Sequence, residues 1–243
     1  MTDAAIRCIG LSKRYGSVAA LADVDLVVRS GEAFGIIGEN GAGKTTLIKC
    51  LLDFCEADAG SVDLYGVSNA IVRAQAVLAY LPERFSPPYY LAGDDFLRYM
   101  AQLHGHAHDE AAAADVLRRL DLPLDALDRP ARTYSKGMAQ KLGLAACLLS
   151  GKQLYVLDEP ASGLDPRARA LLKEELRSLH RSGKTMLLAS HALADVEAVC
   201  DRIGVMHRGA LRYMGTPAAF KRHYGASDFE AAFLACTADE AMC

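Results

Sequence analysis

Apolar residues along this 243-residue chain fall into two kinds of run, which predict two kinds of element. Short continuous or alternating apolar runs are typical of strands, and apolar residues three or four positions apart are typical of helices. The first kind predicts strands near residues 6–12, 22–28, 32–38, 61–66, 77–82, 153–160 and 184–191. The second kind predicts helices over residues 44–55, 93–103, 109–120, 136–149, 166–180 and 192–200.

The order of these runs predicts the architecture. Strands dominate before residue 87, only helical patterns occur over about 87–149, and strands and helices alternate afterwards. Alternation of this kind indicates a mostly parallel sheet with crossover helices. We therefore expect one α/β domain over residues 1–220, with an antiparallel β subdomain, a helical lobe inserted at about 87–149, a hairpin over 202–217 and a short tail over 221–243 that has room for one or two small helices.

The stretch GENGAGKTT follows a predicted strand and opens a predicted helix. It fits the pattern G-x-x-x-x-G-K-[ST], in which backbone N–H groups surround phosphates, the lysine reaches the terminal phosphates and the hydroxyl faces Mg²⁺. A structural glycine turn is the alternative, and both flanks count against it. The predicted ATP-binding residues are Gly38, Glu39, Asn40, Gly41, Ala42, Gly43, Lys44, Thr45 and Thr46.

A second motif, LYVLDEP, is an apolar strand that ends in two adjacent acids, Asp158 and Glu159. Ligands of α/β proteins bind at the carboxyl ends of the strands, where successive side chains point to opposite faces. Asp158 is predicted to hold Mg²⁺ together with Thr45, and Glu159 is predicted to polarise an attacking water. Taken alone, two acids after a core strand are more often a solvated turn. Beside a phosphate loop they indicate a P-loop NTPase.

Composition limits the classes of partner. The net charge of -3 and the absence of a long Lys/Arg block argue against a dedicated nucleic-acid surface. No apolar run approaches the roughly 18 residues that span a bilayer, and the first residues lack a secretory pattern. Seven cysteines without a C-x-x-C pair indicate reduced thiols in the cytosol rather than disulfides, and a zinc site is the weaker alternative. We expect membrane contact only through a partner.

With both motifs in place, the order of the remaining ones resembles the ATP-binding subunit of an ABC transporter along nearly the whole chain. KRYG places Tyr15 at the family's adenine-stacking position, and YLPE places Glu83 in its Q-loop. YSKGMAQKLGLAACLL lies at the signature sequence, SGLDP gives Asp165 of the D-loop, and SH gives the switch histidine His191. Taken alone, Tyr15 would be a strand-end tyrosine packed in the core and His191 a structural histidine, so the order of the motifs carries the resemblance.

The resemblance implies a mechanism. Two subunits would dimerise head to tail, so that Ser135, Lys136, Gly137 and Met138 of one copy face the ATP held by the other. ATP and Mg²⁺ would be the cofactors, Lys44, Glu159 and His191 the catalytic residues, and a homodimer the favoured assembly. An integral membrane permease would be the partner, which places the chain in the cytoplasm, peripheral to the inner face of the membrane.

Two departures from the usual family pattern bear on the subfamily. Glu83 stands where the Q-loop glutamine is usual, and the usual L-S-G-G-Q reads Tyr134 to Met138. The ammonium of Lys136 either strengthens phosphate attraction or points to solvent. Both departures look like those of ATPase subunits that serve ABC-2 type export permeases, so export is the expected direction.

Other functions share some of these motifs. A soluble ABC-type ATPase acting on ribosomes or DNA shares all of them, but it would usually carry a second nucleotide domain or a long coiled coil. A small-metabolite kinase would need no signature helix, and a non-hydrolysing regulator would bind ATP only.

One further cluster, HGHAHDE, presents His104, His106 and His108, which could ligate a transition metal. Its place between two predicted helices favours a polar turn with Asp109 as a helix cap.

Overall fold

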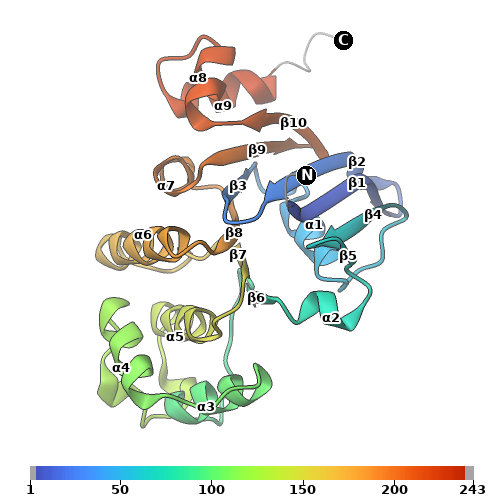
Figure 1. Cartoon of the computed structure of the whole chain (residues 1–243). Helices are drawn as coiled ribbons and strands as arrows, with labels where there is room; N and C mark the ends of the chain where they lie inside the picture. Colours follow the sequence, from blue (N-terminus) through green and yellow to red (C-terminus); the bar gives the residue numbers. More distant parts are fainter. Residues whose placement is uncertain (1–3, 239–243) are drawn as a thin grey trace.

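The computed structural model describes residues 4–238, which fold around two sheets (Figure 1). The antiparallel sheet has the order β2-β1-β4-β5, and the larger sheet has the order β10-β9-β3-β8-β7-β6. Strands β9, β3, β8, β7 and β6 are parallel, and β10 pairs antiparallel with β9. The strands are β1 (Ala4–Tyr15), β2 (Val18–Arg29), β3 (Ala33–Ile37), β4 (Ala59–Leu64), β5 (Val67–Ser68), β6 (Leu78–Leu81), β7 (Leu154–Asp158), β8 (Thr185–Ser190), β9 (Arg202–His207) and β10 (Ala210–Gly215).

The helices cover the larger sheet and form a separate lobe. Figure 1 shows α3, α4 and α5 together below the sheet, α6 and α7 on one side of it, and α1 on the side of the antiparallel sheet. The helices are α1 (Lys44–Leu51), α2 (Val72–Gln75), α3 (Gly93–Leu103), α4 (Glu110–Arg119), α5 (Lys136–Leu149), α6 (Pro166–Arg181), α7 (Leu193–Val199), α8 (Pro217–His223) and α9 (Phe229–Ala238), with short 3-10 turns at Leu124–Ala126 and Ala131–Thr133.

The larger sheet is buried on both faces. In β3, Phe34 and Ile36 pack with α1 and the antiparallel sheet, whereas Ala33 and Ile37 pack with the helices on the other side. All five residues of β7 are buried as well. Parallel strands covered on both faces need apolar residues at every position, which explains why these segments appear in the sequence as continuous apolar runs.

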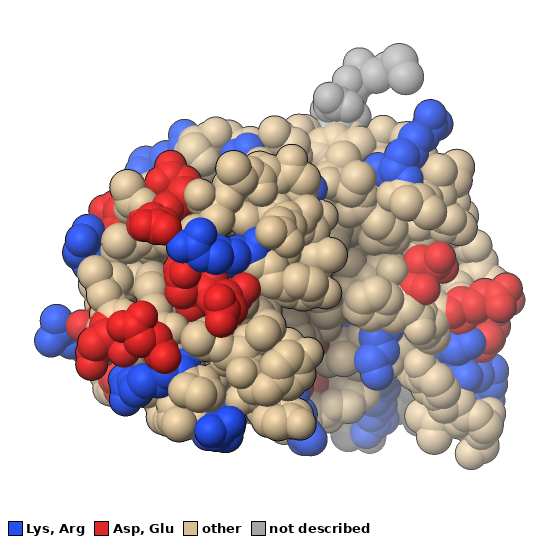
Figure 2. Space-filling view, turned by 90° about the horizontal axis from the view of Figure 1, so that it is seen from below, with Lys and Arg blue, Asp and Glu red and all other residues tan. Residues whose placement is uncertain are grey.

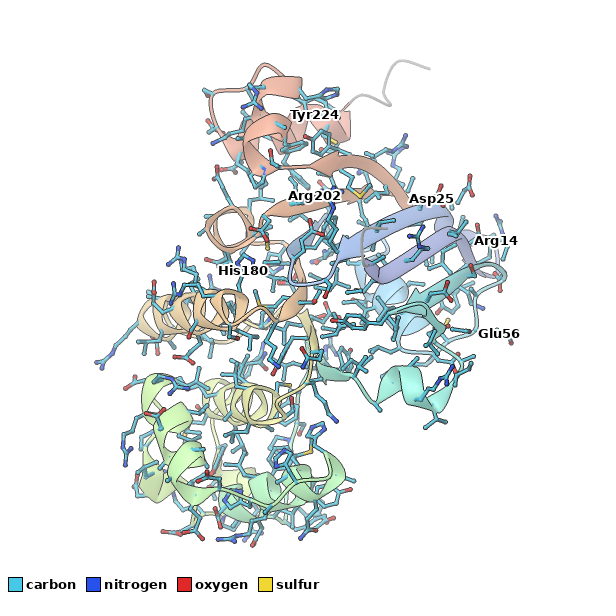
Figure 3. All side chains as sticks on the ribbon, in the orientation of Figure 1. Arg14, Asp25, Glu56, His180, Arg202 and Tyr224 are labelled. Carbon is cyan, nitrogen blue, oxygen red and sulfur yellow. The ribbon has the colours of Figure 1, made fainter. Side chains whose placement is uncertain are left out.

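An ion pair closes the end of the sheet opposite to the candidate site. Arg202 donates from Nη1 to Glu32 Oε1 at 3.0 Å, and its guanidinium lies 5.4 Å from the centre of the Phe34 ring (Figure 3). Glu32 is buried, so the pair is shielded from water. This contact connects the start of β9 to the segment that enters β3.

The predicted fold class is confirmed, and the differences are local. The first helix ends at Leu51 instead of residue 55, because Asp53 adopts a left-handed φ of 57° and the chain turns back there. The four-residue helix α2 was not predicted. No helix within residues 4–238 has the length and apolar character that crossing a membrane requires.

The predicted boundary at residue 220 falls inside α8, which runs from Pro217 to His223. Phe220 is fully buried, and Phe229 and Phe233 of α9 join the same core as the parallel sheet. The described part of the predicted tail therefore completes the domain instead of trailing from it. Residues 239–243 of that tail lie outside the described residues.

Candidate nucleotide-binding site

Four neighbouring strands of the larger sheet end at one edge, and each is followed by a predicted site segment. The glycine-rich loop follows β3, His191 follows β8, Asp158 and Glu159 end β7, and Glu83 follows β6. Carboxyl ends of adjacent parallel strands form the crevice in which α/β proteins bind ligands. Here they surround a cavity of about 440 Å³ lined by Val18, Ala20, Glu39, Asn40, Gly41, Gly43, Lys44, Thr45, Thr46, Glu83, Arg84, Asp158, Glu159 and His191.

The glycine-rich loop has the backbone shape of an anion cradle. Gly43 has a φ of 107°, and a Cβ there would lie 2.5 Å from the carbonyl oxygen of Ala20. No side chain caps α1, and its first turn holds no acidic residue. The first N–H groups of α1 are therefore free of side-chain acceptors, and the helix dipole adds partial positive charge at this end. Glycine at position 43 is required by both conformation and space.

The ammonium of Lys44 is held over this loop. Its Nζ donates to the carbonyl oxygens of Gly38 at 2.6 Å and Glu39 at 3.1 Å, and the residue is buried. Burial lowers the pKa of Lys44, and the nearby carboxylates of Glu159 and Asp158 oppose that effect. Because the ammonium is poorly hydrated, a phosphate that reaches it gains a strong charge-assisted hydrogen bond.

Thr45 and Asp158, the two residues predicted to hold Mg²⁺, contact each other beside the cavity. Thr45 Oγ1 donates to Asp158 Oδ2 at 3.2 Å, and Asp158 is 1% exposed. Its second oxygen, Oδ1, has no hydrogen-bond partner among the described residues, and burial raises the pKa of this carboxyl to about 6. A buried carboxylate with an unpaired oxygen beside a hydroxyl is a donor set that fits a hard divalent cation such as Mg²⁺.

Glu159 is fixed by the segment that follows β8. Its Oε1 accepts from the backbone N–H of His191 at 2.8 Å and lies 2.8 Å from His191 Nδ1, and its Oε2 accepts from Ser190 Oγ at 3.3 Å. Glu159 also has a left-handed φ of 48°, a conformation that costs a non-glycine residue energy and often marks functional sites. The structure thus brings the predicted base and the predicted switch histidine into contact.

The predicted signature residues lie outside the cavity of their own chain. Ser135 caps α5, where its Oγ accepts from the N–H of Met138 at 3.2 Å. Lys136 is exposed and does not line the cavity: its Nζ donates to Ser162 Oγ at 3.0 Å, and its stem packs against Gly163. The predicted signature segment is therefore joined to the predicted D-loop of the same chain, whose Asp165 caps α6.

Tyr15 lies at the end of β1, near the cavity but not in its lining. Its ring is half exposed, and its hydroxyl lies 3.3 Å from Cys55 Sγ. Stacking of adenine on this ring stays a prediction. Sequence reasoning missed Ser190 and Ser162 as partners of Glu159 and Lys136, although both stand next to residues of the recognised motifs. It also missed Arg84, which lines the cavity beside Glu83.

The three histidines lie in the turn between α3 and α4, where Asp109 caps α4 by accepting from the N–H of Ala112. They line a cavity of about 240 Å³ between α3, α4 and α5. Within residues 4–238, no group of three or more His, Cys, Asp or Glu side chains has the arrangement of a metal site.

The raised pKa of Asp158 predicts a stability effect. A carboxyl that is harder to ionise in the folded state destabilises the fold increasingly as pH rises from about 4 to about 6. The shift corresponds to about 3 kcal/mol at most. In the presence of a chelator, Asp158→Asn should therefore raise the free energy of unfolding by about 1–3 kcal/mol at pH 7.5 and by little at pH 4.5, measured by urea denaturation.

Asp165→Asn is the matched control for this measurement. The backbone N–H of Ala168 lowers the pKa of Asp165, so its ionised form stabilises the fold and the amide should lower stability at pH 7.5. If Asp158→Asn and Asp165→Asn lowered the free energy of unfolding equally at pH 7.5, this would contradict the conclusion that ionised Asp158 destabilises the fold.

The fold and the site together define a P-loop nucleotide-binding domain. More specifically, the chain belongs to the ABC transporter family, because that family's model matches residues 21–162. This confirms the resemblance read from the motifs, and ATP is accordingly the nucleotide of the family. The boundary of the helical lobe and the roles of the single site residues stay predictions.

Two sequence relatives show the level of similarity. The chain is 37% identical over 230 residues to the daunorubicin resistance ATP-binding protein DrrA3 of Streptomyces coeruleorubidus, covering 93% of this chain and 72% of that protein. It is 38% identical over 203 residues to an uncharacterized ABC transporter ATP-binding protein of Synechocystis sp., covering 82% of this chain. The match spans 57% of the length of the Synechocystis protein.

A solved structure of an ATP-binding subunit of an ABC transporter superposes with a TM-score of 0.86 at 30% identity, covering 95% of this chain and 98% of that one. A dimeric ATP-binding cassette in a post-hydrolysis state, bound to ADP and Pi, superposes with a TM-score of 0.79 at 18% identity. It covers 87% of this chain and 98% of that one, and it shows the shared fold.

Proposed function

We propose that this chain is the ATP-hydrolysing subunit of an exporter whose membrane-spanning permease is a separate chain. The observation that carries the proposal is the contact of Glu159 with His191 and Ser190, beside a phosphate loop and the unpaired carboxylate of Asp158. A protein that only binds ATP would need the phosphate loop alone. The positioned carboxylate of Glu159 beside that loop supports hydrolysis.

Some residues of the cavity bind the nucleotide, and others take part in its hydrolysis. Lys44 and the N–H groups at the start of α1 bind the phosphates, and Tyr15 offers its half-exposed ring to the adenine. Thr45 and Asp158 hold Mg²⁺, which when bound offsets the charge on the phosphate oxygens.

Glu159 orients an attacking water and takes a proton from it, since its carboxylate lines the cavity and is held by Ser190 and His191. His191 is 65% exposed at its side chain, so its ring can reach a ligand while the carboxylate holds Nδ1. Glu83 adds a carboxylate at the far end of the same crevice.

The signature residues act on a second copy of the chain. Ser135 to Met138 lie at the N-terminus of α5 and outside their own cavity, which leaves this end of the helix available to the ATP of a partner. Two copies arranged head to tail would enclose each ATP between one phosphate loop and one signature helix. ATP binding then closes the dimer, and hydrolysis releases it.

The proposed permease contact lies on the face seen in Figure 2. This view shows acidic and basic side chains interspersed, with wide areas that carry neither. Large apolar side chains are exposed in the stretch from the end of α1 to the end of α3, the helix at the lower end of the molecule in Figure 1: Phe54, Ile71, Val72, Tyr89, Tyr90, Tyr99 and Leu103. An apolar face suits a lasting protein partner better than a nucleic acid.

Several relatives support export as the direction. Proteins named for daunorubicin resistance in Streptomyces coeruleorubidus, linearmycin resistance in Bacillus subtilis and Nod factor export in Ralstonia nicotianae match this chain at 30–37% identity. The proposed location is the cytoplasmic face of the membrane. The alternative, a soluble ABC-type ATPase on ribosomes or DNA, predicts a different partner.

Co-purification from native membranes tests this proposal. The tagged chain, extracted in mild detergent, should retain a polytopic membrane protein that survives a wash in high salt. Mass spectrometry identifies that protein. Recovery in the soluble fraction with ribosomes or nucleic acid, and no membrane protein, would favour the alternative.

A further inference from the structure

Two cysteines at the end of the phosphate-loop helix have their sulfurs in contact. Cys50 Sγ, on the last turn of α1, lies 3.8 Å from Cys55 Sγ. The chain turns back between them because Asp53 has a left-handed φ, and the N–H groups of Asp53 and Phe54 donate to the carbonyl oxygens of Cys50 and Lys49. This helix-ending turn returns Cys55 to the helix it has just left.

The same pair touches a residue of the proposed ATP site. Cys55 Sγ lies 3.3 Å from the hydroxyl of Tyr15, the ring assigned to adenine under the proposed function. Figure 3 shows Arg14 and Glu56, the chain neighbours of Tyr15 and Cys55, at the same outer edge of the molecule. A change at the sulfur of Cys55 therefore acts directly on the position of the Tyr15 ring.

We propose that Cys50 and Cys55 form a redox-sensitive thiol pair, which a small-molecule disulfide such as glutathione disulfide converts into an intrachain disulfide that weakens ATP binding through Tyr15. The formation of the disulfide does not depend on the proposed function. Its effect on ATP does, because that effect rests on the role assigned to Tyr15.

The reaction balances in two exchange steps. The thiolate of Cys55 attacks glutathione disulfide, forms a mixed disulfide and releases one glutathione thiolate. Cys50 then loses its proton to solvent and attacks the Cys55 sulfur, which forms the intrachain bond and releases the second glutathione. Two protein thiols are oxidised by two electrons, and one glutathione disulfide is reduced to two thiols.

Exposure sets the order of these steps. Cys55 is half-buried and reachable, whereas Cys50 is 3% exposed. Burial raises the pKa of Cys50 to about 12, so its thiolate is scarce and the closing step is slow at neutral pH. The rate should rise with pH, because each unit adds tenfold more thiolate in this range.

The contact between the thiols gives the pair its specificity. Closing from 3.8 Å to a covalent bond needs side-chain rotation and a small shift of the turn that carries the half-buried Cys55. Four other described cysteines, Cys8, Cys147, Cys200 and Cys236, are buried. Oxidation of Cys55 also removes the S–H group that faces the Tyr15 hydroxyl.

Peptide mapping tests the disulfide. The full chain, first reduced, is incubated with glutathione disulfide at pH 8.5 under native conditions, alkylated and digested. We expect a linkage between Cys50 and Cys55, with the four buried cysteines alkylated only after unfolding. A linkage between Cys8 and Cys50, a product that stops at glutathionylated Cys55, or no reaction would each overturn the proposal.

Measurement of ATP affinity tests the proposed effect of the disulfide on ATP binding. The net value of one hydrogen bond corresponds to a loss of about threefold to tenfold, so the oxidised wild type should bind ATP that much more weakly than the reduced form. Cys55→Ser keeps a hydroxyl beside Tyr15 and should be insensitive to the oxidant. Tyr15→Phe should form the disulfide without a further loss of affinity.

The outcomes separate this inference from the proposed function. A disulfide that forms in the wild type while ATP affinity stays unchanged overturns the coupling through Tyr15. A reduced wild type that does not bind ATP at all contradicts the proposed function, while the mapping result remains a test of the thiol pair.

Discussion

Glu159→Gln should lower steady-state ATP hydrolysis about 10²–10⁴-fold, the range by which a positioned general base contributes to catalysis. The amide has nearly the same shape as the carboxylate, so it can still accept a hydrogen bond from the N–H of His191. It cannot take a proton from water. Phosphate release measured at saturating MgATP gives the rate.

The same variant should still bind MgATP, because the contacts of Lys44 and Thr45 do not depend on Glu159. Without hydrolysis the closed dimer should accumulate, which size-exclusion chromatography with MgATP detects. Glu174→Gln is the matched control, an exposed acid on α6 that pairs with Arg177. A Glu159→Gln variant that hydrolyses ATP at more than about a tenth of the wild-type rate would exclude Glu159 as the base.

Lys44→Ala should weaken ATP binding by about tenfold to a hundredfold, since a hydrogen bond to a charged group contributes about 1.5–3 kcal/mol. The Lys44 ammonium is held by two loop carbonyls at the start of α1, where the terminal phosphates are expected. Titration of a fluorescent ATP analogue measures the affinity.

Lys49→Ala separates this role from a general loss of charge. Lys49 lies exposed on the last turn of the same helix, so the variant removes one positive charge outside the cavity. Alanine also suits a helix position in both variants. Equal ATP affinities for Lys44→Ala and wild type would contradict the phosphate assignment.

Local sequence patterns predicted most elements and the two motifs of the site. The loop from Gly38 to Thr46 was recognisable because close approach of the backbone to phosphate needs glycines at fixed spacing. Asp158 and Glu159 stood out because a continuous apolar strand ended in two acids. Both signals depend on neighbours within about ten residues, the range over which spacing carries information.

The limits of local patterns show in the same elements. The extra turn expected after Leu51 did not form, because a left-handed residue at Asp53 reversed the chain. The polar residues of α8 gave no sign in the sequence that Phe220 is fully buried. Both differences lie outside the family motifs, in which residue types and spacing are fixed.

By itself, then, the sequence determined the phosphate loop, the acids of β7 and the order of strands and helices, since periodicity and glycine spacing act along the chain. Only the tertiary structure decided the contacts of Glu159 with His191 and Ser190, of Lys136 with Ser162 and of Cys50 with Cys55. Those contacts depend on which strands become neighbours and where turns reverse the chain. Such choices are made by packing a two-faced sheet between helices, which depends on the whole chain at once.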